Sequence, residues 1–280
     1  MLDDVADALR CPICAGPLTR HGQALRCPVG HSYDIAKQDY VTLLSGLAAP
    51  GDTGAMVAAR EEFLGAGHYD WLAESVAEEA ADVGRSPRRV VDAGSGTGFY
   101  LAAVLDRLGP AASGVALDSS AYALRRAARA HPRIGAVGAD LWRPLPVADG
   151  AAALVLNVFA PRNCGEFRRI LAPGGRLLTV TPTDRHLAEL VDLLDLLTVD
   201  EAKERRLAET LGDCFFFQRR SLRDRTLRLD HDAVAALVRM GPSAWHAAPG
   251  ALAARIAELP SEITVTASCY LTVWRPRHSQ

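Results

Sequence analysis

The sequence predicts an α/β protein with an open, doubly wound, mainly parallel sheet, preceded by a small metal-stabilised module at the N-terminus. Two observations indicate this fold. Strand and helix patterns alternate from residue 88 onward, and four cysteine and histidine residues cluster within the first 31 positions. The chain has 280 residues, of which 49% are hydrophobic, so it can bury a sizeable core.

The alternation that predicts the sheet begins with the strand RRVVDAG and runs through five strand patterns. Parallel strands joined by right-handed crossovers are the expected result. The five predicted strands are 88–94, 114–120, 135–140, 151–159 and 174–182, with helices over 100–108 and 121–131 and a short helix before the fifth strand. A helix over 186–197, an arginine-rich strand, helices over 230–240 and 251–259, and a last strand over 263–274 follow.

The N-terminal cluster has the spacing of a metal site. Cys11, Cys14, Cys27 and His31 form the pattern C-x2-C-x12-C-x3-H. Three thiolates and one imidazole suit tetrahedral Zn²⁺, and four protein ligands leave no open position for chemistry. We therefore expect a structural zinc ion on which this small module folds. Unrelated buried cysteines are the alternative, and His21 fits the turn spacing less well than His31.

Composition divides the chain into three expected segments. The stretch GLAAPGDTG at 46–54 has the small residues of a linker, and residues 56–83 have a helical pattern with a break at 65–67. We expect a metal-binding module over residues 1–45, a linker and helical lead-in over 46–85, and the main domain over 86–280. A concave active site between module and main domain would follow from such a linker.

The glycine-rich stretch VVDAGSGTGFYL indicates a nucleotide-like cofactor. Gly94, Gly96 and Gly98 allow a sharp turn and close approach of the backbone to a ligand, although G-x-G-x-G alone is a weak signal. Asp118, at the end of the next strand, can accept both ribose hydroxyls, and Asp140, at the end of the third, can reach an adenine amino group. Together these residues point to S-adenosylmethionine. Asp118 may alternatively be read as the N-cap of the following helix.

The fourth strand ends in the sequence LNVFAPRN, at the edge of the sheet where ligands of such folds bind. The side-chain amide of Asn157 can bond a planar base edge, which makes it the candidate catalytic residue. The same amide can equally brace the loop, and the sequence does not separate these two roles.

Arginine is concentrated in the stretch RRSLRDRTLRLD at 219–230, although the formal net charge of the chain is −2. The alternation predicts a strand with one arginine-lined face, either facing phosphates or lying as a solvated edge strand. The net charge counts against nucleic-acid binding through charge alone. The five arginines are Arg219, Arg220, Arg223, Arg225 and Arg228.

Over nearly its whole length the sequence resembles a known family, the 23S rRNA guanine-N1 methyltransferases, which join an N-terminal zinc ribbon to a Rossmann-like class I methyltransferase domain. The segments that carry the resemblance are CPIC and CPVGHSYDIAKQDYVTLL, PGDTGAMVAAREEFLGAGHY, DAGSGTG, NVFAPRN, LAPGG, TPTDRHLAEL and MGPSAWH. The order of these segments makes the resemblance specific. Within the family the chain looks closest to the tylosin-resistance branch, which modifies a guanine in hairpin 35 of 23S rRNA.

The resemblance implies roles that the residues alone would not. The four N-terminal ligands would bind zinc, and the ribbon would recognise RNA beside the catalytic cleft. Cofactor contacts would come from Tyr69, Thr97, Gly98 and His186, although Tyr69 and His186 taken alone would more often be packed or surface residues. The acidic residues Asp3, Asp4 and Asp7 leave the RNA-binding face of the ribbon open.

The expected activity is S-adenosylmethionine-dependent methylation of guanine N1 in hairpin 35 of 23S rRNA. The target base would be in a loop or extruded and would stack on an aromatic side chain, for which Phe159 and Trp245 are candidates, unless they are core residues. One alternative is a methyltransferase acting on tRNA or a small molecule. Another is a noncatalytic zinc-ribbon binding protein whose main domain only holds a ligand.

The sequence also predicts where the protein works. No window approaches the run of about 18 apolar residues of a membrane span, and the N-terminus MLDDVADALR is acidic where a signal peptide would be basic. We expect a cytoplasmic protein without membrane contact. Cys164, Cys214 and Cys269 are widely scattered, so reduced cysteines in a reducing compartment are expected. Formation of a homodimer is left open.

Overall fold

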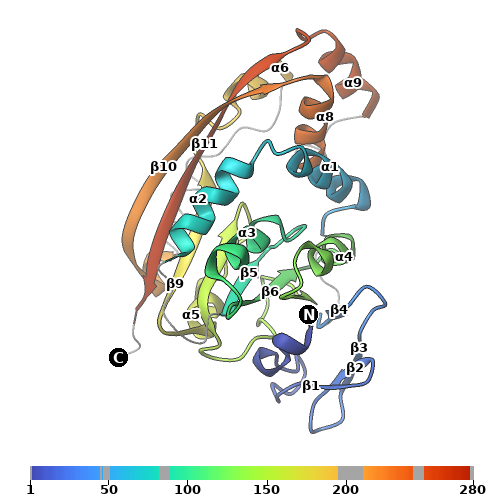
Figure 1. The fold of residues 1–280 in the computed structure, drawn as a ribbon, viewed down its shortest axis with the longest axis vertical. Helices are drawn as coiled ribbons and strands as arrows, with labels where there is room; N and C mark the ends of the chain where they lie inside the picture. Colours follow the sequence, from blue (N-terminus) through green and yellow to red (C-terminus); the bar gives the residue numbers. More distant parts are fainter. Residues whose placement is uncertain are drawn as a thin grey trace.

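The computed structural model describes residues 2–44, 46, 51–81, 89–194, 211–241 and 249–277 (Figure 1). The helices are η1 Leu2–Asp4, η2 Ala6–Ala8, α1 Gly54–Gly65, α2 Asp70–Ala80, α3 Phe99–Leu108, α4 Ala121–Ala130, α5 Cys164–Ile170, α6 Ala188–Leu194, α8 His231–Met240 and α9 Pro249–Ala257. The strands are β1 Thr19–His21, β2 Ala24–Arg26, β3 Ser32–Asp34, β4 Tyr40–Thr42, β5 Arg89–Ala93, β6 Ser113–Asp118, β7 Ile134–Gly138, β8 Ala152–Val158, β9 Leu171–Pro182, β10 Phe215–Leu229 and β11 Ile263–Pro276.

Eight strands form one sheet in the order β10-β11-β9-β8-β5-β6-β7-β4. The strands from β9 to β4 are parallel, whereas β11 is antiparallel to both β9 and β10. The order in which strands are added to the sheet reverses at β5, because β6 and β7 lie on one side of β5 and β8 and β9 lie on the other. This order confirms the doubly wound sheet, and it places the carboxyl ends of β5, β6 and β8 at one edge.

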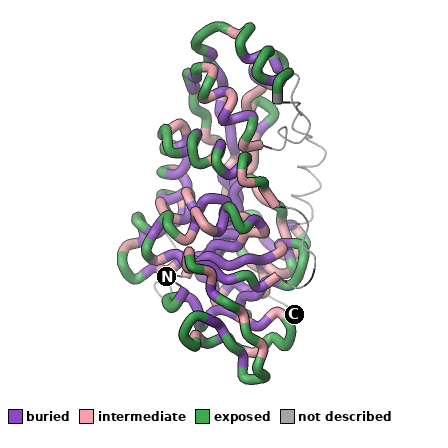
Figure 2. Tube along the Cα trace, turned by 90° about the vertical axis from the view of Figure 1, so that its right-hand side faces the viewer, coloured by how far each residue is buried: buried purple, intermediate pink, exposed green. Residues whose placement is uncertain are grey.

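The sheet separates two apolar clusters, because successive residues of a strand point to opposite faces. Val90 belongs to one cluster, with residues of α2, α3 and α8, and Val91 belongs to the other. β7 and β8 are buried along their whole length, as expected for strands covered on both faces. Figure 2 shows these buried residues running through the middle of the molecule.

The N-terminal module is attached to the main sheet more closely than its sequence indicates. Its strands β1, β2 and β3 form a separate antiparallel sheet, but β4 pairs in parallel with β7 at the edge of the large sheet. Leu2, Leu9 and Leu25 of the module share the second apolar cluster with Val91 and Val115. Residues 2–44, the described part of the module, therefore pack on the main domain through a common core and a shared strand pair.

A long hairpin of β10 and β11 extends from the sheet and carries α8 at its far end (Figure 1). The two strands pair over 14 positions, with an irregularity between Phe217 and Arg219. β10 is the edge strand, and its side chains alternate between partly buried and exposed positions over much of its length. The long C-terminal strand thus runs from the main sheet toward the helices α1, α8 and α9, which gather at one end of the molecule.

One expectation about the cysteines is wrong. The structure joins Cys164, at the start of α5, to Cys214, just before β10, in a disulfide with Cα atoms 5.9 Å apart. The two residues are 50 positions apart in the sequence, so only the packing of α5 beside the segment leading into β10 brings them together. Cys269 is a free, buried thiol. No helix in the described part of the chain is long and apolar enough to cross a membrane.

Candidate cofactor and metal sites

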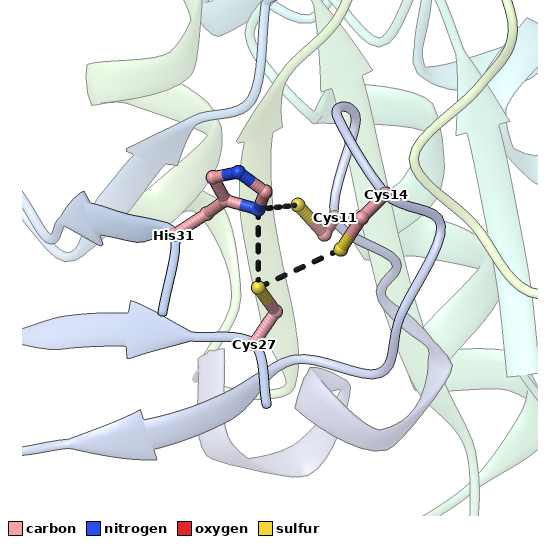
Figure 3. Close-up of side chains that lie close together, drawn as sticks. All are labelled: Cys11, Cys14, Cys27 and His31. Atoms are coloured by element: carbon pink, nitrogen blue, oxygen red, sulfur yellow. Dashed lines mark hydrogen bonds between the residues drawn. The ribbon is translucent and has the colours of Figure 1, made fainter. Parts of the chain in front are cut away.

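The four predicted metal ligands lie together at the N-terminal module (Figure 3). His31 Nδ1 is 3.5 Å from Cys11 Sγ and 3.3 Å from Cys27 Sγ, and the Sγ atoms of Cys14 and Cys27 are 3.6 Å apart. Tetrahedral Zn²⁺ with ordinary Zn–S and Zn–N bond lengths separates its ligand atoms by roughly 3.5 to 3.8 Å. The four side chains therefore fit a zinc ion in both chemistry and spacing.

Side chains around the zinc ligands form contacts within the protein, and these include two of the acidic residues near the N-terminus. Tyr33 Oη lies 3.1 Å from Cys11 Sγ, the position of an outer hydrogen-bonding group that orients a ligand. Asp3 pairs with Arg20 within the module, and Asp7 pairs with Arg89 at the start of β5. These two acids serve contacts inside the protein, so they do not have to face RNA.

The glycine loop lies between β5 and α3, as predicted. Gly94, Gly96 and Gly98 all have positive φ angles, which side chains other than glycine rarely adopt. A Cβ atom on Gly94 would lie 2.4 Å from Cβ of Ala160, so the loop after β8 approaches the backbone too closely for any other residue. Gly98 is the N-cap of α3, and Thr97 before it is buried.

Asp118 is the last residue of β6 and contacts this loop, whereas Asp140 lies two residues beyond the end of β7. Asp118 accepts hydrogen bonds from the backbone N–H groups of Gly96 (2.9 Å) and Ser120 (2.8 Å). The N-cap of α4 is Ser120, whose hydroxyl accepts from Ala123, so the capping role considered for Asp118 is wrong. Each carboxylate oxygen keeps acceptor capacity for a ribose hydroxyl. Asp140 accepts from the backbone N–H of Trp142 (3.0 Å), and its other carboxylate oxygen lies 3.7 Å from Nε of Arg143.

The site contains buried polar atoms that lack partners. Asp92 Oδ1, Ser95 Oγ and Asn157 Oδ1 form no hydrogen bond with the described residues. Burial, followed by the charge of Asp118, raises the pKa of the Asp92 carboxyl to about 8. Orphaned buried polar atoms are rare in folded proteins unless a ligand or water meets them. Their location in the glycine loop and at the adjoining strand ends fits a polar cofactor. The sequence reasoning did not single out Asp92.

Asn157 is completely buried, with 0% of its surface exposed. Its amide nitrogen donates to the carbonyl oxygens of Ala93 and Pro161, both at 2.9 Å. The amide thus braces the loop after β8 against the end of β5, which is the bracing role that the sequence left open. A contact between Asn157 and a substrate stays a prediction.

Three aromatic rings from distant segments meet beside the glycine loop. The Tyr69 hydroxyl lies 3.4 Å from His186 Nε2, and the Phe159 ring centre lies 5.7 Å from that of His186. Burial lowers the pKa of His186 to about 4, so its ring is neutral near pH 7. Tyr69 is buried, whereas Phe159 is 41% exposed. The structure therefore brings together two residues that the resemblance assigned to the cofactor and one assigned to the target base.

Phe159 also has an unusual backbone, with a φ angle of +50°. A bulky residue in this region is strained by about 1 to 3 kcal/mol, and such strain gathers at functional sites. The backbone N–H of Phe159 bonds to Val180 O of β9 and holds the conformation. Trp245, the second stacking candidate, lies outside the described residues.

Three of the five arginines of β10 share one face of the strand. Alternation along the strand places Arg219, Arg223 and Arg225 on one side and Arg220 and Arg228 on the other. Arg219 pairs with Glu79 of α2, Arg220 stacks on Tyr270, and Arg228 approaches Glu262. Arg223 and Arg225 form no ion pair within the part of the chain that the structure describes, so these two are the arginines best placed to meet an external anion.

A surface hollow of about 340 Å³ lies between the start of α2 and β10. Its lining includes Asp70, Glu74, Arg225 and Arg228, and none of the glycine-loop residues. The hollow is therefore separate from the cofactor site, and its mixed charge favours no single class of ligand.

Comparison with known proteins agrees with both sites. Residues 9–45 match the family described as the RlmA N-terminal zinc ribbon, and residues 90–175 match the family described as a methyltransferase domain. Among solved structures, a Haloferax volcanii methyltransferase in complex with the activator Trm112 covers 82% of this chain and all of its own, with a TM-score of 0.52 and 20% identity. This similarity shows the class I methyltransferase fold, and the methyltransferase-domain match over residues 90–175 identifies S-adenosylmethionine as the cofactor.

Two curated proteins match along their full lengths. A Streptomyces fradiae protein named 23S rRNA (guanine(748)-N1)-methyltransferase is 53% identical over 99% of both chains. A Micromonospora griseorubida protein named for guanine-N1 methylation of 23S rRNA is 52% identical over 99% of this chain and all of its own. With a zinc ribbon, a glycine loop and this similarity in one chain, the protein belongs to the 23S rRNA (guanine-N1)-methyltransferase family.

Proposed function

We propose that this enzyme transfers a methyl group from S-adenosylmethionine to N1 of a guanine in hairpin 35 of 23S rRNA. The observation that carries the proposal is 53% identity along 99% of both chains to a relative whose name states this reaction at guanine 748. We assign the same guanine to this chain. The ribbon, packed on the main sheet through β4, would present the RNA to the site at the carboxyl ends of β5 and β8.

The residues around the glycine loop would hold the cofactor. Asp118 would bind the ribose hydroxyls and Asp140 the adenine amino group, while Thr97 and Gly98 would contact the cofactor from the loop. Bound S-adenosylmethionine supplies an activated methyl group on a positively charged sulfur. The protein's own contribution is orientation of the two reactants and a fixed electrostatic environment.

The aromatic cluster suits a reaction beside a sulfonium cation. The neutral ring of His186 would add no positive charge beside a bound sulfonium, and the faces of the Tyr69 and Phe159 rings would attract such a cation. Methylation replaces the N1–H bond of guanine by an N1–C bond, so the N1 proton leaves to solvent or a neighbouring acceptor. The guanine must be unpaired to expose N1, and exposed Phe159 offers it a stacking surface.

Primer extension on 23S rRNA treated with the protein and S-adenosylmethionine tests the proposal directly. A methyl group on guanine N1 blocks base pairing, so we expect a new reverse-transcriptase stop at guanine 748. A transcript with adenine at this position and a reaction without cofactor should give no stop. Cofactor binding without any stop would favour tRNA or a small molecule as substrate, and absence of cofactor binding would favour a noncatalytic zinc-ribbon protein.

The physiological role that we propose is resistance to tylosin-type macrolides, exerted in the cytoplasm on the ribosome. A methyl group on a base that lines the peptide exit tunnel changes the surface on which such a drug sits. Expression in a sensitive host should raise the inhibitory concentration of tylosin in proportion to the fraction of rRNA methylated. Full methylation with unchanged sensitivity would indicate a housekeeping role instead.

A further inference from the structure

Arg60 of α1 has a partly buried side chain that sequence reasoning did not connect with the cofactor. Its side chain is 23% exposed, and its guanidinium pairs with the carboxylate of Asp52. Nη2 donates a hydrogen bond of 2.8 Å to the carbonyl oxygen of Met240 at the end of α8. The guanidinium is thus held between α1, α8 and the segment that leads into α1.

The same guanidinium lies against the glycine loop. A Cβ atom built on Gly96 would be 3.3 Å from Arg60 Nη1, so the absence of a side chain at Gly96 is what leaves room for the charge. Burial raises the pKa of Asp118, and the Arg60 charge acts in the opposite direction. Arg60 therefore faces the same space as the ribose-binding carboxylate.

S-adenosylmethionine carries a carboxylate at the end of its methionine part. A carboxylate that enters a partly buried site needs a cation or several hydrogen-bond donors to offset its lost hydration. A guanidinium offers two parallel N–H donors that match both carboxylate oxygens. In this structure Arg60 already binds one carboxylate, that of Asp52, whose side chain is 28% exposed and can turn toward solvent.

We infer that Arg60 binds the methionine carboxylate of S-adenosylmethionine and exchanges Asp52 for it when the cofactor enters. The inference rests on the proposed function, because it presupposes that cofactor. A purely structural role is the competing explanation, in which Arg60 only ties α1 to α8 and to the segment before it.

Isothermal titration calorimetry with two ligands separates these explanations. S-adenosylhomocysteine carries the carboxylate, and its decarboxylated analogue lacks only that group. We expect wild-type protein to bind S-adenosylhomocysteine about 10- to 100-fold more tightly than the analogue, as for one hydrogen-bonded charge pair. In Arg60→Gln this preference should fall to about threefold or less, with little change in affinity for the analogue.

Arg126→Gln is the matched control, because Arg126 forms an exposed ion pair with Glu61, the residue next to Arg60. Its ligand preference should equal that of wild type. Arg60→Lys keeps the positive charge but lacks the planar guanidinium, so it should retain part of the preference for S-adenosylhomocysteine over the decarboxylated analogue. This variant replaces Arg60→Gln in the test if Arg60→Gln does not fold.

Equal weakening of both ligands by the Arg60 variants would overturn the inference in favour of a structural tether. An unchanged preference, or the lack of any preference in wild type, would overturn it as well. Failure of wild type to bind either ligand would instead overturn the cofactor assignment, and with it the proposed function.

Discussion

Phe159 combines three properties that single residues seldom share: exposure, a positive φ angle and contact with a partly buried, neutral histidine. Each property alone has an ordinary structural explanation. Together they describe a partly exposed ring on the loop after β8, next to the residue that approaches Gly94. The backbone of Phe159 is bonded to Val180 of β9.

Phe159→Ala should lower kcat/KM for 23S rRNA by about 5- to 100-fold, since stacking of a base on an aromatic ring contributes about 1 to 3 kcal/mol. Affinity for S-adenosylhomocysteine should change little, and Phe159→Trp should restore most of the activity. Single-turnover kinetics with a hairpin 35 transcript would measure the effect. Equal loss in the alanine and tryptophan variants would argue against stacking.

Asp92 is 1% exposed and carries the raised pKa of about 8 described above. The folded protein therefore keeps its carboxyl protonated at neutral pH, whereas the unfolded chain releases that proton near pH 3.8. Because the folded state binds more protons than the unfolded state in this window, stability falls as pH rises from about 4 to about 8.

Asp92→Asn removes this titration, so the variant should gain stability relative to wild type as pH rises toward 8. The difference can grow by at most about 1.4 kcal/mol for each pH unit and should level off above pH 8. Unfolding of both cofactor-free proteins by denaturant from pH 5 to pH 9 would test this prediction. The zinc site is the same in both proteins, so its pH dependence cancels in the difference between their free energies of unfolding. A difference that is constant across this range would contradict the assigned pKa.

At the scale of elements, the ends of β5, β8 and β9 decide where chemistry can occur. β5 leads into the glycine loop, β8 into the loop with Phe159, and β9 into the turn with His186. Because the strands are parallel, these turns lie at one edge of the sheet. In the chain, about 60 positions separate the glycine loop from Phe159, and about 25 separate Phe159 from His186. α1 and α2 complete the site from the side, through Arg60 and Tyr69.

β10 supplies two arginines without a described acidic partner, and we predict that they contact RNA phosphates. The double substitution Arg223→Glu and Arg225→Glu should weaken RNA binding and reduce the slope of log K against log salt by about 1.5. The control carries the same charge change at the exposed Arg107 and Arg129 of α3 and α4. Filter binding over a range of salt concentrations measures both, and equal slopes for variant and wild type would make β10 an ordinary solvated edge strand.

At the scale of the molecule, the metal-binding module and the methyltransferase domain are mechanically coupled. β4 pairs with β7, and apolar residues of the module complete one of the two cores. Figure 1 shows the module at the β4 end of the sheet, on the side away from β10 and β11. Loss of order in the ribbon would therefore expose part of the main core.

Removal of zinc should lower the stability of the whole chain rather than that of the ribbon alone. A ligand that binds only the folded state stabilises it, and a loss of roughly 3 kcal/mol corresponds to a fall in Tm of about 5 to 10 °C for a chain of this size. Calorimetry with and without chelator, with metal content measured in parallel, would show this. Two separate transitions, one unaffected by the chelator, would contradict the shared core.

The sequence by itself determined the zinc ligands, the glycine loop and the order of strands and helices in the main domain, because each depends on residues close together in the chain. Metal-ligand spacing, turns that require glycine and hydrophobic periodicity are all local signals. A family resemblance added Tyr69 and His186, which no local pattern distinguishes from packed residues.

Only the tertiary structure decided which distant residues meet. It paired β4 with β7, joined Cys164 to Cys214, brought Tyr69 and Phe159 to His186 and set Arg60 against Gly96. The physical reason is common to all four. Each contact depends on how the elements pack against one another, and a side chain's role is then set by neighbours that lie far away in the sequence.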